Sequence, residues 1–219
     1  MNNRTEMSIK RGLACFALFI LLVGITFYPI VVPDKVALEQ SGLLLIFLYI
    51  LEFSFIVPLY FIFFRKWEDM GRGYFSVSQF LIFLLIILLA QTAVAYILDI
   101  RAAERWVMEQ ETGKGSLFWL NFFMLVLIVP IYEELAFRGG LLTALLVFFR
   151  GNIYIASLVT SFLFAALHTQ YTDVRTLIVL FLISIILIAS RIISRGILMP
   201  IALHMAMNCV ILSAGIYTM

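Results

Sequence analysis

Residues 115–149 read GSLFWLNFFMLVLIVPIYEELAFRGGLLTALLVFF, an almost unbroken apolar run in which Glu133, Glu134 and Arg138 are the charged exceptions. A helix needs about 20 predominantly apolar residues to cross the hydrocarbon core of a bilayer, so this run is long enough to span it. Charged side chains inside a membrane are costly and usually serve a function. The run therefore predicts a membrane-spanning helix that carries chemistry.

The composition of the whole chain is that of a membrane protein. Hydrophobic residues make up 64% of its 219 residues, charged residues make up 13%, and Phe occupies 21 positions. The net charge of +2 gives no indication of nucleic-acid binding. We expect one integral membrane domain over residues 1–219, an all-α polytopic membrane helix bundle of about seven transmembrane helices. The runs that predict these helices are 12–33, 42–64, 74–98, 115–149, 151–167, 176–190 and 196–219.

Basic residues between these runs predict the orientation of the bundle. Cytoplasmic loops of membrane proteins carry an excess of Lys and Arg. The side that holds the amino terminus has nine such residues and the opposite side has five, with the intramembrane Arg138 left out. We therefore expect a cytoplasmic amino terminus, and we expect the membrane to be a bacterial cytoplasmic membrane. The nine are Arg4, Lys10, Arg11, Arg65, Lys66, Arg72, Arg150, Arg191 and Arg195, and the five are Lys35, Arg101, Arg105, Lys114 and Arg175.

The two histidines of the chain lie in apolar surroundings. If residues 150–152 form a tight turn between antiparallel helices, Glu133 and His168 each lie about 17 residues from it, at a similar depth. On the next hairpin, His204 and Asn208 are four residues apart and share one helix face. The spacing therefore predicts that a carboxylate, two imidazoles and an amide meet inside the membrane.

The two pairs would lie at different depths if every helix were straight. The second pair lies roughly 12 to 18 Å from its turn at residues 191–196, whereas the first pair lies roughly 26 Å from its own. A helix that ends or kinks near Gly139 and Gly140 would remove this difference. We therefore predict a kinked or interrupted helix after the Glu-Glu-x-x-x-Arg motif, with residues 141–149 as a short helix in or near the membrane interface.

Three motifs, taken in order, resemble those of a known family. They are Glu133-Glu134-Leu-Ala-Phe-Arg138-Gly139, then Phe164 four residues before His168, then His204 four residues before Asn208. Their order and spacing resemble the CAAX prenyl protease and bacteriocin-processing (CPBP) family of intramembrane endopeptidases. The resemblance covers about residues 118–209.

The resemblance implies a role for each matching residue. Glu133 is expected to activate water as general base, with His168 as a second base or proton shuttle. His204 and Asn208 are expected to hold the carbonyl and the developing oxyanion. Glu134 and Arg138 lie one helical turn apart and are expected to form an ion pair that supports the site.

We expect no cofactor, with a metal ion as the alternative. The histidines lie on separate segments, without the His-Glu-x-x-His arrangement of zinc proteases, which favours a glutamate mechanism. The alternative is a zinc ion held by Glu133, His168 and His204, with water in the fourth position.

The function favoured by these residues is hydrolysis of a peptide bond with glutamate-activated water. The expected partners are a peptide, or a lipidated or membrane-associated protein, as the substrate, and the surrounding membrane lipid. The alternative is a non-proteolytic membrane scaffold or regulator of the same fold, which binds a partner or confers bacteriocin immunity; the polar residues would then only hold helices together. A transporter is a third class, less favoured because we detect no internal repeat.

Glu52 lies near the middle of the run 42–64 and belongs to none of the three motifs. An ionised carboxylate is unfavourable at such a position. Three roles stay open from the sequence: a protonated and hydrogen-bonded carboxyl, a partner of Arg138 from another helix, or part of a water-filled cavity that leads to the site.

Overall fold

Each predicted apolar run forms a helix. The structure is a computed structural model that describes residues 3–67, 70–100, 104 and 115–217, and no strand occurs within these ranges. The predicted loop residues Arg101, Arg105 and Lys114 lie outside the described residues. The α-helices are α1 Asn3–Thr26, α2 Lys35–Gln40, α3 Leu44–Leu59, α4 Val77–Ile97, α6 Ser116–Phe123, α7 Val129–Glu134, α8 Leu142–Phe148, α9 Ile153–Ala166, α10 Val174–Ser194 and α11 Leu198–Tyr217, with a 3₁₀ turn η1 at Tyr28–Ile30 and π-helical turns η2 at Tyr60–Phe64, η3 at Met124–Ile128 and η4 at Leu135–Leu141.

Length and composition make this a multi-pass membrane protein. Two of its apolar helices, Ile153–Ala166 and Leu198–Ala214, are shorter than the rest. The five that are long and apolar enough to cross a membrane are Ile9–Ile30, Leu44–Phe64, Val77–Ile97, Ser116–Phe148 and Val174–Ser194. The predicted all-α architecture is therefore confirmed.

Polar side chains at the turns fix where several helices begin. Ser76 accepts a hydrogen bond from the amide of Gln79 at the start of α4, at 3.4 Å. Asn152 accepts one from Ile155 at the start of α9, at 3.1 Å. Asp173 does the same for α10. Such caps satisfy amide groups that have no partner within the helix, so they set the ends of segments whose interiors are uniformly apolar.

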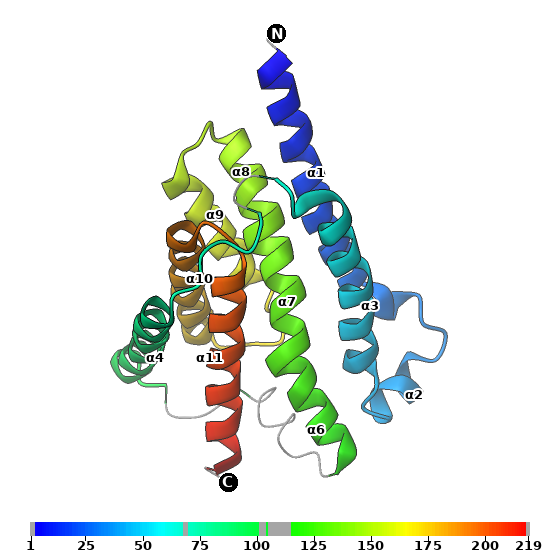
Figure 1. Ribbon diagram of the computed structural model, residues 1–219. Helices are drawn as coiled ribbons and strands as arrows, with labels where there is room; N and C mark the ends of the chain where they lie inside the picture. Colours follow the sequence, from blue (N-terminus) through cyan, green and yellow to red (C-terminus); the bar gives the residue numbers. More distant parts are fainter. Residues whose placement is uncertain (1–2, 68–69, 101–103, 105–114, 218–219) are drawn as a thin grey trace.

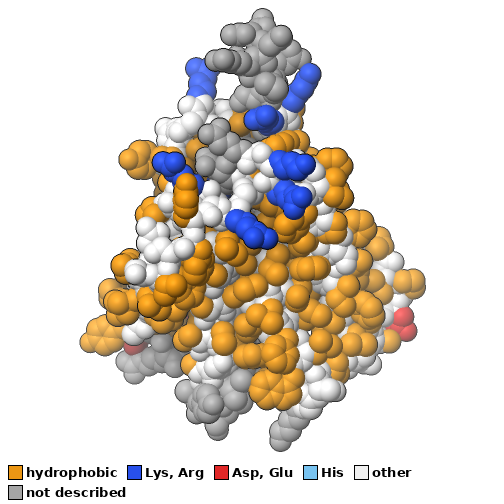
Figure 2. Space-filling model, in the orientation of Figure 1, with side chains coloured by type: hydrophobic (Ala, Val, Ile, Leu, Met, Phe, Trp, Pro, Cys, Tyr) orange, Lys and Arg blue, Asp and Glu red, His pale blue; other side chains and the backbone are white. Residues whose placement is uncertain are grey.

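The surface separates basic from apolar side chains. Figure 2 shows Lys and Arg gathered at one end of the molecule, above a broad apolar surface. Exposed basic residues of the amino-terminal group are Lys10, Arg11, Arg65, Lys66, Arg72, Arg150 and Arg195. This distribution agrees with the grouping expected from the sequence, and the side of the membrane on which the group lies stays a prediction.

A long central helix organises the bundle. It runs from α6 through α7 to α8, with α1 and α3 on one side and α4, α10 and α11 on the other (Figure 1). Helix α1 packs against α8 and η4, whereas α10 packs against α9, α4 and α11. The residues of α7 therefore lie between two groups of helices.

The central helix is interrupted after the Glu-Glu-x-x-x-Arg motif by a π-helical turn, but it does not end at the glycines. It continues through Gly139 and Gly140 to Phe148, and the α geometry changes to a π-helical turn over Leu135–Leu141. Both glycines are buried in close contacts: a Cβ on Gly139 would lie 2.8 Å from the Tyr60 ring. On Gly140 it would lie 2.9 Å from the carbonyl oxygen of Cys15 in α1. The two glycines thus serve close helix approach. Residues up to Phe148 continue the span that begins at Ser116, so they do not form the separate interfacial helix that we predicted for residues 141–149.

The depth difference behind that prediction has another explanation. The turn between α8 and α9 is exposed, but in the turn between α10 and α11 Gly196 and Ile197 are buried against the segment 70–74, and only the side chain of Arg195 is exposed. Ile197 donates its amide proton to the carbonyl of Gly71 at 3.0 Å, and Tyr74 donates to Ser194 at 2.7 Å. A Cβ on Gly196 would lie 2.3 Å from the Gly73 nitrogen, so the two backbones touch. The second turn starts inside the molecule, and His204 therefore reaches the depth of Glu133 without a break in the central helix.

Candidate active site

The four predicted catalytic side chains line one cavity. Its volume is about 770 Å³, and it lies between the two groups of helices that flank α7. Most of its wall is apolar, and its polar lining includes Glu133, His168, His204, Asn208 and Glu52. Side chains from α7, α11 and the end of α9 thus meet as the spacing predicted.

Glu134 and Arg138 form the buried ion pair expected from their spacing. The Nη1 atom of Arg138 lies 2.8 Å from Oε1 of Glu134, and neither side chain is exposed. Nη2 of Arg138 donates to the hydroxyl of Ser184 in α10 at 3.0 Å, and its guanidinium lies 4.5 Å above the Phe164 ring. These contacts compensate the loss of water around the charge, and they join α7, α9 and α10.

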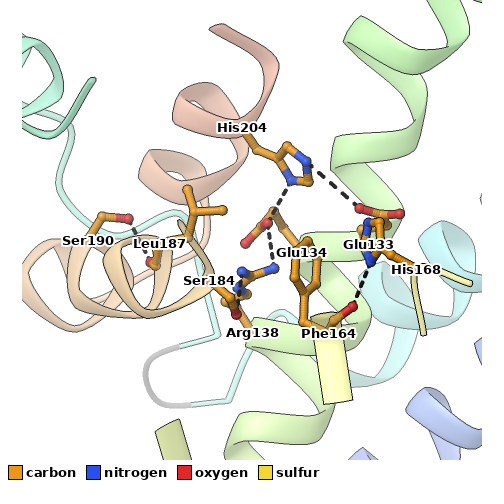
Figure 3. A network of polar contacts seen from close by, with 9 residues as sticks. All are labelled: Glu133, Glu134, Arg138, Phe164, His168, Ser184, Leu187, Ser190 and His204. Carbon is orange, nitrogen blue, oxygen red and sulfur yellow. Dashed lines mark hydrogen bonds and ion pairs between the residues drawn. The ribbon is translucent and has the colours of Figure 1, made fainter. Parts of the chain in front are cut away.

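The ring of His204 lies between the two glutamates. Its Nδ1 is 2.9 Å from Oε1 of Glu134, and its Nε2 is 3.9 Å from Oε2 of Glu133 (Figure 3). The carboxylate of Glu134 can only accept, so Nδ1 carries a proton, and Nε2 is the ring nitrogen that faces Glu133. The side chain of Glu133 is 17% exposed and that of Glu134 is fully buried. Only the first glutamate is therefore available to a molecule in the cavity.

His168 lies two residues after the end of α9 and is half-buried. Its Nδ1 lies 2.6 Å from the carbonyl oxygen of Phe164, which can only accept, so this nitrogen donates. Tyr171 stacks on the imidazole with an interplanar angle of 3°. Nε2 of His168 is thereby left as the acceptor nitrogen of the neutral ring.

Asn208 has a partner that the sequence did not reveal. Its Nδ2 donates to the carbonyl oxygen of Leu125 at 2.9 Å. In the π-helical turn η3 the amide of Val129 donates to the carbonyl of Met124, five residues earlier. In the same register, the donor to the Leu125 carbonyl would be the amide of Pro130. Proline has no N–H, and the side chain of Asn208 supplies the missing donor.

Several further side chains of this site were not predicted. No sequence motif identifies Ser184 or Tyr171 as a site residue. Ser184 is a single hydroxyl residue in an apolar helix, and Tyr171 lies in a short loop. Phe164 lies against Phe137, with 5.1 Å between ring centroids. Its contact with the Arg138 guanidinium could not be foreseen, because it depends on how α9 packs against η4.

Glu52 lies in the wall of the same cavity. It is 5% exposed, accepts a hydrogen bond from Thr26 at 3.1 Å and accepts another from the hydroxyl of Tyr132. The contacts described for Arg138 lead instead to Glu134, Ser184 and Phe164. Of the three roles left open, the hydrogen-bonded carboxyl and the cavity wall agree with this geometry.

A second polar cluster connects the segment before α6 to the start of α10. Glu104 accepts a hydrogen bond from the amide of Asp173 at 3.0 Å, and Arg175 donates to the carbonyl oxygens of Leu98 and Asp99 at 3.1 Å. The Arg175 guanidinium beside Asp173 lowers the pKa of that carboxyl. These contacts hold the loop that carries His168.

Comparison with known proteins identifies the part of the chain that carries the site. The family model described as "Type II CAAX prenyl endopeptidase Rce1-like" matches residues 115–210. This part of the chain is a Rce1-like domain. The match confirms the resemblance expected over about residues 118–209. The Rce1-like domain runs from the start of α6 into α11 and contains all six predicted site residues, whereas Glu52 lies outside it.

One curated relative also matches part of the chain. It is an Escherichia coli protein described as an uncharacterized 24.3 kDa protein, and it is 37% identical over 86 residues. The match covers 39% of this chain and 40% of that protein. No solved structure matches the chain.

Proposed function

We propose that the chain is an intramembrane endopeptidase that hydrolyses a peptide bond of a membrane-associated peptide or protein, using a water molecule activated by Glu133. The observation that carries the proposal is the meeting of one carboxyl, two imidazoles and an amide on a single cavity of the Rce1-like domain. Family membership supports proteolysis, and the geometry supports the assignment of roles.

Glu133 is the general base in this mechanism. It takes a proton from water while the oxygen of that water attacks the peptide carbonyl carbon, and the proton then passes to the leaving amine. The 3.9 Å between Glu133 and Nε2 of His204 is too long for a hydrogen bond, but one water molecule can contact both atoms. His168 assists through Nε2, because its other nitrogen already donates to Phe164.

The oxyanion is held by donors from α11. Asn208 has two amide protons, one of which goes to Leu125, so the second can serve the oxyanion. His204 is held in orientation by Glu134 and can donate from Nε2 when it is protonated. Removing one such donor typically lowers kcat by about 10² to 10³-fold.

Accumulated peptides in cells test this proposal. Cells carrying the native chain, Glu133→Gln or the control Glu39→Gln are compared by mass spectrometry of membrane and secreted peptides. Glu39 is exposed on α2, outside the cavity. We expect a longer species that accumulates with Glu133→Gln alone. Identical profiles from all three strains would contradict proteolysis and favour the scaffold function.

Metal removal tests the glutamate mechanism separately. Among the described residues no group of three or more His, Cys, Asp and Glu side chains is arranged to hold a metal ion. We expect the purified chain to keep its activity after treatment with a strong chelator. Loss of activity that zinc restores would replace the proposed base with a zinc-bound water held by Glu133, His168 and His204.

A further inference from the structure

Glu52 differs from Glu134 in how its buried carboxyl is satisfied. Glu134 is paired with the Arg138 guanidinium, whereas the described contacts of Glu52 are to the hydroxyl groups of Thr26 and Tyr132. Both glutamates are buried inside spanning helices. A carboxyl kept there without a cation is expensive, which indicates a functional role.

The hydrogen bonds of Glu52 lead to the proposed base. Tyr132 precedes Glu133 in α7, is 2% exposed and donates its hydroxyl proton to Glu52 in α3. Tyr132, Glu52 and Glu133 all line the cavity. The hydroxyl of Thr26 can also donate to the carbonyl of Leu22, at 3.1 Å. Loss of Glu52 would therefore leave Thr26 with an acceptor, whereas Tyr132 would lose the acceptor described for it.

We propose that Glu52 is a positioning residue of the hydrolytic site, which holds Tyr132 and thereby fixes the direction of the Glu133 side chain toward His204. The inference rests on the proposed peptidase function. The turn that carries both Tyr132 and Glu133 lies between the π-helical turns η3 and η4. Helix geometry changes on either side of this turn, so a side-chain contact to α3 is well placed to fix its rotation.

The test uses three variants of the purified chain acting on internally quenched peptides in detergent. Glu52→Leu removes the acceptor, Glu52→Gln retains one acceptor oxygen, and Tyr132→Phe removes only the donor. The control is Tyr60→Phe, which removes another buried tyrosine hydroxyl, one that donates to the carbonyl of Met70 outside the cavity.

We expect Glu52→Leu and Tyr132→Phe to lower kcat by about tenfold or more with KM changed less than twofold, because small misplacements of a catalytic group slow the reaction without weakening binding. Glu52→Gln should recover most of kcat. The combination of Glu52→Leu with Tyr132→Phe should be no slower than either variant alone, since both break the same contact.

The outcomes separate this inference from the proposed function. If the native chain cleaves peptides and Glu133→Gln does not, but kcat is unchanged in Tyr132→Phe, the function stands and the positioning role is overturned. A tenfold loss in Tyr60→Phe would also overturn it, because any buried hydroxyl would then have the same effect. Absence of cleavage by the native chain overturns both proposals.

Discussion

Arg138 is fully buried, and its partners come from three helices. Breaking a buried ion pair leaves one charge without compensation, which costs more than the pair contributes. We expect Arg138→Met to lower the free energy of unfolding by about 3 to 5 kcal/mol, measured by denaturant unfolding in detergent. The double variant Glu134→Gln with Arg138→Met should recover part of this loss. If the double variant were less stable than Arg138→Met, the loss would not come from the uncompensated Glu134.

Asn208 has an observed structural contact and a proposed catalytic role, and mutations can separate the two. Asn208→Ala leaves the Leu125 carbonyl without a donor, at a cost of about 1 to 3 kcal/mol in the free energy of unfolding. Pro130→Ala restores an N–H in that register, so the same Asn208→Ala change should cost less stability in the Pro130→Ala background. Peptide cleavage should remain low in the double variant, because the proposed oxyanion donor is still missing. Full recovery of cleavage would show that Asn208 acts only on helix structure.

Contacts within one helix were predictable from the sequence, whereas contacts between helices were not. The Glu134–Arg138 pair was predictable because i and i+4 side chains meet on any helix. The bond between Asn208 and Leu125 was not, because it requires a π-helical register that places a proline opposite a carbonyl. The contact between His204 and Glu134 joins residues 70 positions apart and depends on how α11 packs against α7.

At the scale of the helix, Gly140 sets the distance between α1 and the central helix. A Cβ at this position would lie 2.9 Å from the backbone oxygen of Cys15, where neither helix can yield by rotating a side chain. We expect Gly140→Ala to lower the free energy of unfolding by about 1 to 3 kcal/mol, measured in detergent. Gly24→Ala is the matched control, since a Cβ on that α1 residue has nothing within 4 Å. An equal loss in both variants would contradict the close approach as the cause.

Helices were predictable individually, but their ends and depths were not. Uniformly apolar runs identify spanning helices by length, and each predicted run contains a helix. The prediction of an end or a kink near Gly139 and Gly140 assumed that both turns lie at the membrane surface; the helix does not end there, and a π-helical turn interrupts its α geometry. The turn at Arg195–Ile197 is instead covered by residues 70–74, a long-range contact that hydropathy does not contain.

The basic end of the molecule and the loop that carries His168 lie on opposite sides of the predicted membrane topology. The exposed basic residues of the amino-terminal group lie at one end, and Thr172 and Arg175 follow the His168 loop on the opposite side of the predicted topology. The cavity is lined by spanning helices and also by loop residues on the His168 side, among them Glu104 and Gln170. The orientation of the basic end therefore determines which compartment the loop side of the cavity faces, and, under the proposed function, the side from which a soluble segment of the substrate would reach Glu133.

Cysteine labelling can determine this orientation. Arg150 and Thr172 are exposed at opposite ends of α9 and its following loop, so Arg150→Cys and Thr172→Cys report on the two sides. Both are made in a Cys209→Ser background, because Cys209 is exposed while Cys15 is buried. With a membrane-impermeant maleimide on intact cells, we expect labelling of Thr172→Cys and none of Arg150→Cys until the membrane is opened, since the basic end should face the cytoplasm. The reverse pattern would place the amino terminus outside and would show that the nine-to-five excess of Lys and Arg does not set the topology.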